Sequence, residues 1–237
     1  DIFIGVDAPE FNLTLEKNLK KAGIKTIHYV SPSIWAWRKN RVKRIKKSVD
    51  KMLCILPFEP QIYEKYKIPA KYIGHPLADT IPYDLNKENI RNGLGIKTSV
   101  LVAILPGSRI NEIRQLGPIF VKTAKLMRRS YNNISFIAPM ASNDIKTIFK
   151  VIVNEYEMGE YFIISEKNKF HESIIASDMV ISASGTAILE SALLERPTIA
   201  AYKVSSSSYF ILKALVKTEY FTLPNILLEE NIIPEYI

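Results

Sequence analysis

The sequence VLVAILPGSR, residues 100–109, is an apolar run that ends in small residues and an arginine. The sequence MVISASGTAILE, residues 179–190, has the same character. Each pattern is typical of a strand, a turn and then a helix, and the first turn of that helix offers free backbone N–H groups to a phosphate. Two such turns in one sheet predict a site for a nucleotide diphosphate.

Apolar runs and amphipathic segments alternate along the whole chain, which indicates βαβ units, parallel sheets and an α/β fold. The expected strands are residues 2–6, 26–30, 52–56, 72–73, 100–105, 134–138, 161–164, 179–182 and 198–202. We also expect helices over residues 13–22 and in the long segment that follows Pro118.

Proline, asparagine and aspartate interrupt this pattern near residues 81–86, which predicts a domain boundary. The expected domains are residues 1–83 and residues 84–237. The first has about four expected strands, too few for a doubly wound sheet. We therefore expect that an N-terminal half-domain and a C-terminal closing segment lie outside this sequence.

Composition sets broad limits on the class of protein. The chain has 237 residues, 47% of them hydrophobic, which is enough for a substantial core. Its uncharged runs are shorter than the roughly 18 residues of a membrane span. The single cysteine, Cys54, lies in an apolar run and is expected to be a buried hydrophobic residue, which fits a reducing cytoplasm.

The net charge of +8 favours polyanionic partners, whether nucleic acid, anionic lipid headgroups or phosphorylated substrates. A lysine-rich solvated surface explains the same charge.

The segment of residues 38–47 holds seven basic residues, with Val42, Ile45 and Val49 on one helical face. Beside Trp35 and Trp37, such a helix suits an anionic membrane surface; the alternative is a surface helix packed through its aliphatic face.

Three residues carry the predicted chemistry at the first phosphate turn. Gly107 and Ser108 form the turn, and Arg109 offers a planar clamp for a diphosphate. Arg109 is equally spaced for an i, i+3 ion pair with Glu112.

The second turn is the stronger anion-binding pattern. Gly185 permits close approach of the backbone, and Ser184 and Thr186 supply hydroxyl donors. Glu190, just over one helical turn later, is placed to reach ribose hydroxyls. An ordinary capped helix with a surface carboxylate is the alternative.

Asp7 follows the first expected strand, at the edge of the sheet where ligands bind in open α/β folds. A carboxylate there suits a general base acting on a substrate hydroxyl. The alternative is an N-cap for the next helix, although Asn12 is better placed for that task.

Histidine spacing predicts no metal site. His75 follows a strand near the predicted boundary. It would either face a cleft or have a purely structural role. His28 lies in a strand and is expected in the core, and His171-Glu172 lacks the second histidine of a zinc helix. Walker A, G-x-G-x-x-G, G-x-S-x-G and D-x-D patterns are absent from the sequence. After these motifs are set aside, the sequence still predicts a nucleotide-diphosphate site that uses no metal or other cofactor.

Several of these motifs together resemble the lipid A disaccharide synthase family. They are residues 29–38 (YVSPSIWAWR), 56–59 (LPFE), 73–76 (IGHP), 105–109 (LPGSR), 184–190 (SGTAILE), 216–218 (VKT) and 223–225 (LPN). The resemblance implies the GT-B architecture of two Rossmann-like domains, with residues 1–83 on the acceptor side and residues 84–237 binding the UDP-sugar. The family's N-terminal Gly- and Glu-containing loop is absent from this sequence.

The resemblance also implies an inverting glycosyltransferase. It would move 2,3-diacylglucosamine from UDP-2,3-diacylglucosamine onto 2,3-diacylglucosamine 1-phosphate, giving the β-1,6-linked disaccharide 1-phosphate and UDP. It would act in the cytoplasm, as a peripheral protein on the anionic inner membrane of a Gram-negative cell, as a possible homo-oligomer and without nucleic acid. A nucleotide-sugar epimerase of the same architecture and a basic nucleic-acid- or membrane-binding protein are the alternatives.

Roles follow by motif from the resemblance. Asp7 matches the family's candidate base, and Gly107–Arg109, Ser184–Thr186 and Glu190 fall in its UDP-binding region. His75 and Asn225 are assigned to a cleft. Contacts to the acceptor or the membrane are assigned to Trp35, Trp37, Arg38, Arg41 and Arg44.

Overall fold

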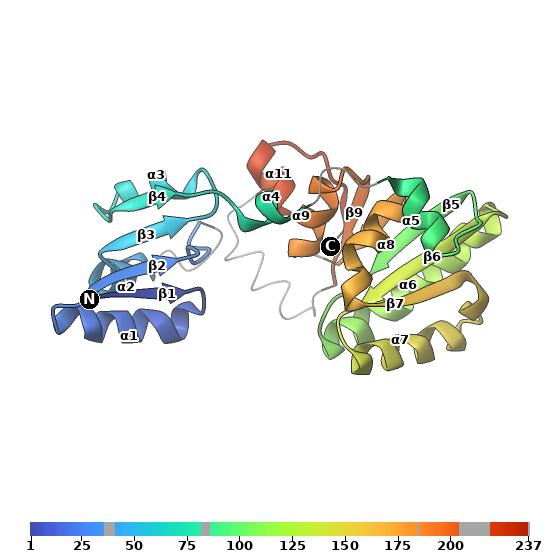
Figure 1. Ribbon diagram of the computed structural model, residues 1–237, viewed down its shortest axis with the longest axis horizontal. Helices are drawn as coiled ribbons and strands as arrows, with labels where there is room; N and C mark the ends of the chain where they lie inside the picture. Colours follow the sequence, from blue (N-terminus) through green and yellow to red (C-terminus); the bar gives the residue numbers. More distant parts are fainter. Residues whose placement is uncertain (36–40, 82–85, 184, 204–218, 237) are drawn as a thin grey trace. The chain divides into compact units, whose positions relative to one another are not determined.

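The computed structural model describes residues 1–35, 41–81, 86–183, 185–203 and 219–236. The described residues form two compact units, each with a parallel sheet of its own (Figure 1). The first unit covers Asp1–Thr80, and the second begins at Ile81 and includes the segment from Glu219 onward.

The sheet of the first unit has the strand order β1-β2-β3-β4, and every pair is parallel. Its strands are β1 (Ile2–Val6), β2 (Lys25–Tyr29), β3 (Lys51–Cys54) and β4 (Ala70–Tyr72). Its helices are α1 (Pro9–Lys21), α2 (Arg41–Ser48), α3 (Glu59–Glu64) and α4 (Pro76–Thr80).

Apolar side chains from α1, α2 and β3 form the core of this unit. Leu13, Ile45, Met52 and Cys54 are completely buried there. Burial raises the pKa of the Cys54 thiol to about 12, so the thiol is protonated at neutral pH. The prediction that Cys54 is a buried hydrophobic residue is confirmed.

A buried polar pair lies inside the same core. His28 Nδ1 of β2 is 2.7 Å from Glu16 Oε1 of α1, and both side chains are fully buried. The prediction that His28 is a core residue is confirmed. Gly5 of β1 is paired with His28 in the sheet, and a Cβ at Gly5 would collide with Glu16 Oε1 unless that side chain shifted.

The second unit has a six-stranded parallel sheet with the order β10-β9-β8-β5-β6-β7. Its strands are β5 (Val100–Leu105), β6 (Ile134–Met140), β7 (Phe162–Glu166), β8 (Met179–Ser182), β9 (Thr198–Ala201) and β10 (Glu235–Tyr236). Its described helices are α5 (Lys87–Gly93), α6 (Ile110–Ser130), α7 (Asn143–Glu155), α8 (Phe170–Ala176), α9 (Thr186–Leu193) and α11 (Leu223–Leu228), with short 3-10 turns η1 (Gly159–Tyr161) and η2 (Lys167–Lys169).

The chain order reverses between two neighbouring strands of this sheet. From β5 the chain first proceeds outward through β6 and β7, then returns to β8 on the other side of β5. Right-handed crossovers therefore place α6 and α7 on one face of the sheet, and α8 and α9 on the other. The carboxyl ends of β5 and β8 are the switch point, where open α/β sheets bind ligands.

Two predicted helices are present but begin earlier than predicted. Helix α1 begins at Pro9 rather than residue 13, and Asn12 is not its N-cap, because its buried amide binds the carbonyl oxygens of Val6 and Asp7 instead. Pro118 lies inside α6 instead of preceding a helix. The two-residue strand β10 was not predicted, since so short a segment has no periodicity of its own.

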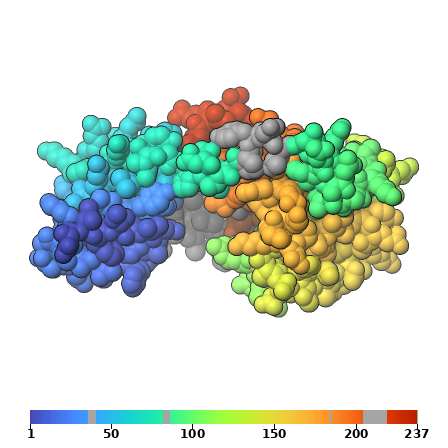
Figure 2. All heavy atoms as spheres, in the orientation of Figure 1, coloured from blue at the N-terminus to red at the C-terminus, as the bar shows by residue number. Residues whose placement is uncertain are grey.

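Asp178 ties α5 to the sheet of the second unit. Its carboxylate is 2.5 Å from Lys87 Nζ and 3.5 Å from Arg91 Nη1 of α5, and it accepts the N–H of Leu101 at 2.7 Å. Helix α5 also contacts α8, as the space-filling view shows (green against orange, Figure 2). Partial burial opposes ionisation, but the hydrogen bonds and the two cations hold the pKa of Asp178 below its ordinary value of 3.8.

We expect Asp178→Asn to lower the free energy of unfolding at neutral pH by about 1–3 kcal/mol, because charge-assisted hydrogen bonds are lost. A lowered pKa in the folded protein gives stability that is present above pH 3.8 and is lost as the pH falls through the folded pKa. The difference between wild type and variant in urea unfolding should therefore shrink below pH 3.8. A difference that is independent of pH would contradict this account.

Candidate functional site

A pocket of about 960 Å³ opens at the carboxyl ends of β5 and β8. The register pairs Leu105 with Ser182, so the last residues of the two strands lie next to each other. The turns that follow, at Gly107 and at Gly185, both line the pocket. The fold thus brings the two predicted phosphate turns together in one site, at the switch point of the sheet.

The first turn is shaped by a glycine and a carboxylate. Gly107 has φ 116°, a conformation that favours glycine, and Arg109 then starts α6 as its N-cap. Arg109 Nη1 donates to Glu112 Oε1 at 2.7 Å, which is the i, i+3 pair that the spacing allows. The guanidinium is largely exposed and lines the pocket.

The second turn leaves open space for a ligand. Gly185 has φ 130°, and among the described residues, its chain neighbours apart, no heavy atom would lie within 4 Å of a Cβ built at this position. Thr186 begins α9, and its exposed side chain also lines the pocket. Ser184, which the sequence assigns to this turn, lies outside the described residues.

Glu190 reaches the same pocket and has a partner that the sequence did not predict. Its Oε2 lies 2.7 Å from His171 Nε2 of α8, and both residues line the pocket. The Glu190 side chain is 16% exposed and that of His171 is 36% exposed. Only the packing of α8 against the sheet brings these residues together, so spacing along the chain gives no signal for His171.

Asp7 follows β1 in the first unit. Its N–H donates to Tyr29 O at 2.8 Å, and Asn12 Nδ2 donates to Val6 O at 3.0 Å and Asp7 O at 2.8 Å. Asp7 and Ala8 have φ values of 47° and 40°, uncommon for residues with a side chain. The turn is thus held by its backbone, and the exposed Asp7 carboxylate is available for chemistry.

The two residues assigned to a cleft, His75 and Asn225, differ in how far they are buried. His75 is half-buried, and its Nδ1 accepts the N–H of Leu77 at 3.2 Å. Asn225 is completely buried, and its assignment to a cleft stays a prediction. Its amide accepts the N–H groups of Ile232 and Ile233 and donates to Ile233 O, so it holds the chain before β10 in place.

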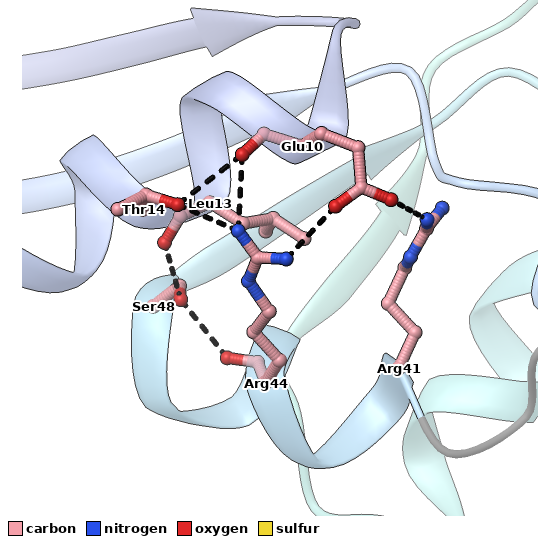
Figure 3. Close-up of polar contacts among 6 residues, drawn as sticks. All are labelled: Glu10, Leu13, Thr14, Arg41, Arg44 and Ser48. Atoms are coloured by element: carbon pink, nitrogen blue, oxygen red, sulfur yellow. Dashed lines mark hydrogen bonds and ion pairs between the residues drawn. The ribbon is translucent and has the colours of Figure 1, made fainter.

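The basic helix α2 packs by its aliphatic face. Val42 and Ile45 are buried in the core of the first unit, so the alternative of a packed surface helix is confirmed, and these residues offer no apolar face to a membrane. Arg41 and Arg44 extend toward Glu10 of α1 and form ion pairs with it (Figure 3).

Arg44 is held by two further hydrogen bonds. Its Nη2 donates to Glu10 O at 3.0 Å and to Thr14 Oγ1 at 2.6 Å.

Trp35 is half-buried and packs edge-on against Phe58 with 5.4 Å between ring centroids. Trp37 and Arg38 lie outside the described residues.

Neither a metal site nor a membrane span is found in the part of the chain that the structure describes. No three His, Cys, Asp or Glu side chains there are grouped to hold a metal ion. No helix there is long and apolar enough to cross a membrane.

Solved structures define the class of fold. The chain is similar to S. aureus MnaA solved with UDP, with a TM-score of 0.61 and 14% identity over 97% of this chain and 66% of that one. It is also similar to Anabaena HepE solved with UDP and glucose, with a TM-score of 0.52 and 12% identity over 83% and 58%. These likenesses and the parallel-sheet units confirm the GT-B fold that the family resemblance implies.

Sequence comparison identifies the family. All 237 residues match the family model described as lipid-A-disaccharide synthetase. The chain is 45% identical to the lipid-A-disaccharide synthase of Idiomarina loihiensis, over 99% of this chain and 62% of that protein. It is 46% identical to that of Wigglesworthia glossinidia brevipalpis, over 100% and 62%. The chain belongs to the lipid A disaccharide synthase family and spans about 62% of these relatives' length.

Proposed function

We propose that the protein is an inverting glycosyltransferase that moves 2,3-diacylglucosamine from UDP onto 2,3-diacylglucosamine 1-phosphate. The observation that carries this proposal is the pairing of two glycine turns, at Gly107 and Gly185, around one pocket at the switch point of a parallel sheet. Membership of the family supports a nucleotide-sugar donor and a lipid-phosphate acceptor. Residues 84–237 bind the UDP-sugar, and residues 1–83 contribute the acceptor side.

The hydrogen-bond donors around the pocket suit a nucleotide diphosphate. The N-terminal turns of α6 and α9 and the Arg109 guanidinium would face the diphosphate, and Glu190 would face the ribose hydroxyls. Charge accumulates on the diphosphate as the glycosidic bond breaks. Donors that are already aimed at this group stabilise the transition state more than the ground state, which is the source of catalysis.

Asp7 is the base in this proposal. Its carboxylate takes the proton of the acceptor 6-hydroxyl as that oxygen attacks the anomeric carbon, and UDP leaves from the opposite face. The two hydrogen bonds from Asn12 and the one to Tyr29 fix the backbone on both sides of the carboxylate. Fixed geometry of this kind is what general-base catalysis requires.

The lipid substrates also support a peripheral location on the inner membrane. The net charge of +8 favours an anionic lipid surface over neutral partners. Arg44 is the better candidate for that surface, because its side chain is 38% exposed even while it is paired with Glu10, whereas that of Arg41 is 13% exposed.

A mass-spectrometric end-point assay of the intact protein tests the reaction. It contains UDP-2,3-diacylglucosamine, with or without 2,3-diacylglucosamine 1-phosphate. We expect the disaccharide 1-phosphate and UDP only when the acceptor is present. A change in the sugar nucleotide without acceptor would indicate an epimerase or a hydrolase instead. Salt-dependent binding of DNA or RNA with no turnover would favour the nucleic-acid alternative.

A further inference from the structure

Glu112 lies in the first turn of α6 and lines the pocket, but the function proposed above does not use it. Its Oε2 accepts the backbone N–H of Ser108 at 3.0 Å and that of Arg109 at 3.3 Å. Its Oε1 accepts Arg109 Nη1 at 2.7 Å. One carboxylate therefore occupies three donors of the first phosphate turn.

These donors are the groups that a diphosphate needs at this turn. Carboxylate and phosphate oxygens are both anionic acceptors, and each bonds readily to backbone N–H groups and to a guanidinium. Partial burial opposes the ionisation of Glu112, but the hydrogen bonds from Arg109 and Ser108 lower the pKa of its carboxyl. Glu112 is thus ionised at neutral pH, and it would repel a diphosphate placed beside it.

The turn is built around this carboxylate. A Cβ at Gly107 would lie 2.6 Å from Glu112 Oε2 and 2.7 Å from Glu112 Cβ. Only glycine leaves space for the carboxylate to lie against the turn. The close contact at Gly107 and the three hydrogen bonds both place the Glu112 carboxylate against the turn, so the turn accommodates an anion.

We propose that Glu112 is an internal competitor of the ligand's diphosphate. It holds the turn and Arg109 in order while the pocket is empty, and it leaves these donors when the nucleotide binds. The proposal rests on the proposed function, because it requires a nucleoside diphosphate at this pocket. Its consequence is that binding a diphosphate includes the cost of breaking the Glu112 contacts, whereas binding a nucleoside without phosphate does not.

Isothermal titration of the intact protein tests the competition with three ligands: UDP, inorganic pyrophosphate and uridine. Glu112→Gln keeps the size of the side chain and removes its charge. We expect the variant to bind UDP and pyrophosphate about three- to tenfold more tightly than wild type, since fewer charge-assisted contacts must be broken. Uridine affinity should not change.

Glu157→Gln is the matched control, because Glu157 is exposed, pairs with Lys125 and does not line the pocket. It makes the same change of net charge and should leave all three affinities unchanged. Unchanged or weaker UDP binding by Glu112→Gln would overturn the competition. If wild type and both variants all fail to bind UDP, the proposed function fails as well.

Discussion

Asp7→Asn is expected to abolish turnover while UDP binding stays intact. The amide cannot accept the proton of the acceptor hydroxyl, and removal of a general base costs about 10²- to 10⁴-fold in rate. Asparagine has nearly the same size and tolerates the left-handed conformation that Asp7 adopts at φ 47°. The rate of disaccharide formation and the dissociation constant of UDP, measured on the same preparation, separate the two effects.

Asp144→Asn provides the control for this experiment. Asp144 is an exposed aspartate at the start of α7 and does not line the pocket, so its loss should leave turnover unchanged. Retained turnover in Asp7→Asn would refute the role of Asp7 as the base. Loss of UDP binding in that variant would show that Asp7 serves the nucleotide site instead.

His28→Leu is expected to destabilise the protein strongly. The replacement leaves the fully buried Glu16 carboxyl without its partner at 2.7 Å. Within the part of the chain described, the other oxygen, Glu16 Oε2, already has no hydrogen-bond partner. Removing one member of a buried pair costs about 3–5 kcal/mol. The change in the free energy of unfolding is measured by urea denaturation monitored by circular dichroism.

A double variant shows whether the unpaired carboxyl is the cause. Glu16→Met with His28→Leu replaces the whole pair by apolar side chains, and such replacements are often neutral or stabilising. The double variant should therefore recover most of the stability that His28→Leu loses. A double variant as unstable as the single one would assign the loss to packing around β2 and contradict this explanation.

Strands could be predicted from the sequence where they are apolar and long enough to show their pattern. The bounds of β1, β5 and β8 are as predicted, and the other predicted strands differ at their ends. Helix α1 was predicted to begin too late, because Asn12 bonds to the preceding turn rather than capping a helix. β10 depends on its pairing with β9, which only the folded chain provides.

The candidate site could be predicted only in part. The residues of each turn are contiguous, so Gly107–Arg109 and Gly185–Thr186 stand out in the sequence. The contact of His171 with Glu190 spans two elements and depends on how α8 packs. The structural role of Asn225 could not be predicted from its motif position, because its amide bonds to backbone groups that only the folded chain brings near β10.

Hydrogen–deuterium exchange of the intact protein, with and without UDP, tests most directly whether the two glycine turns bind the nucleotide diphosphate. The account predicts slower exchange on UDP binding at residues 105–112 and 182–190, because their backbone N–H groups would contact the ligand or become covered by it. Uridine should protect these N–H groups less. UDP binding that leaves both turns unprotected, or that protects only residues elsewhere, would contradict the account.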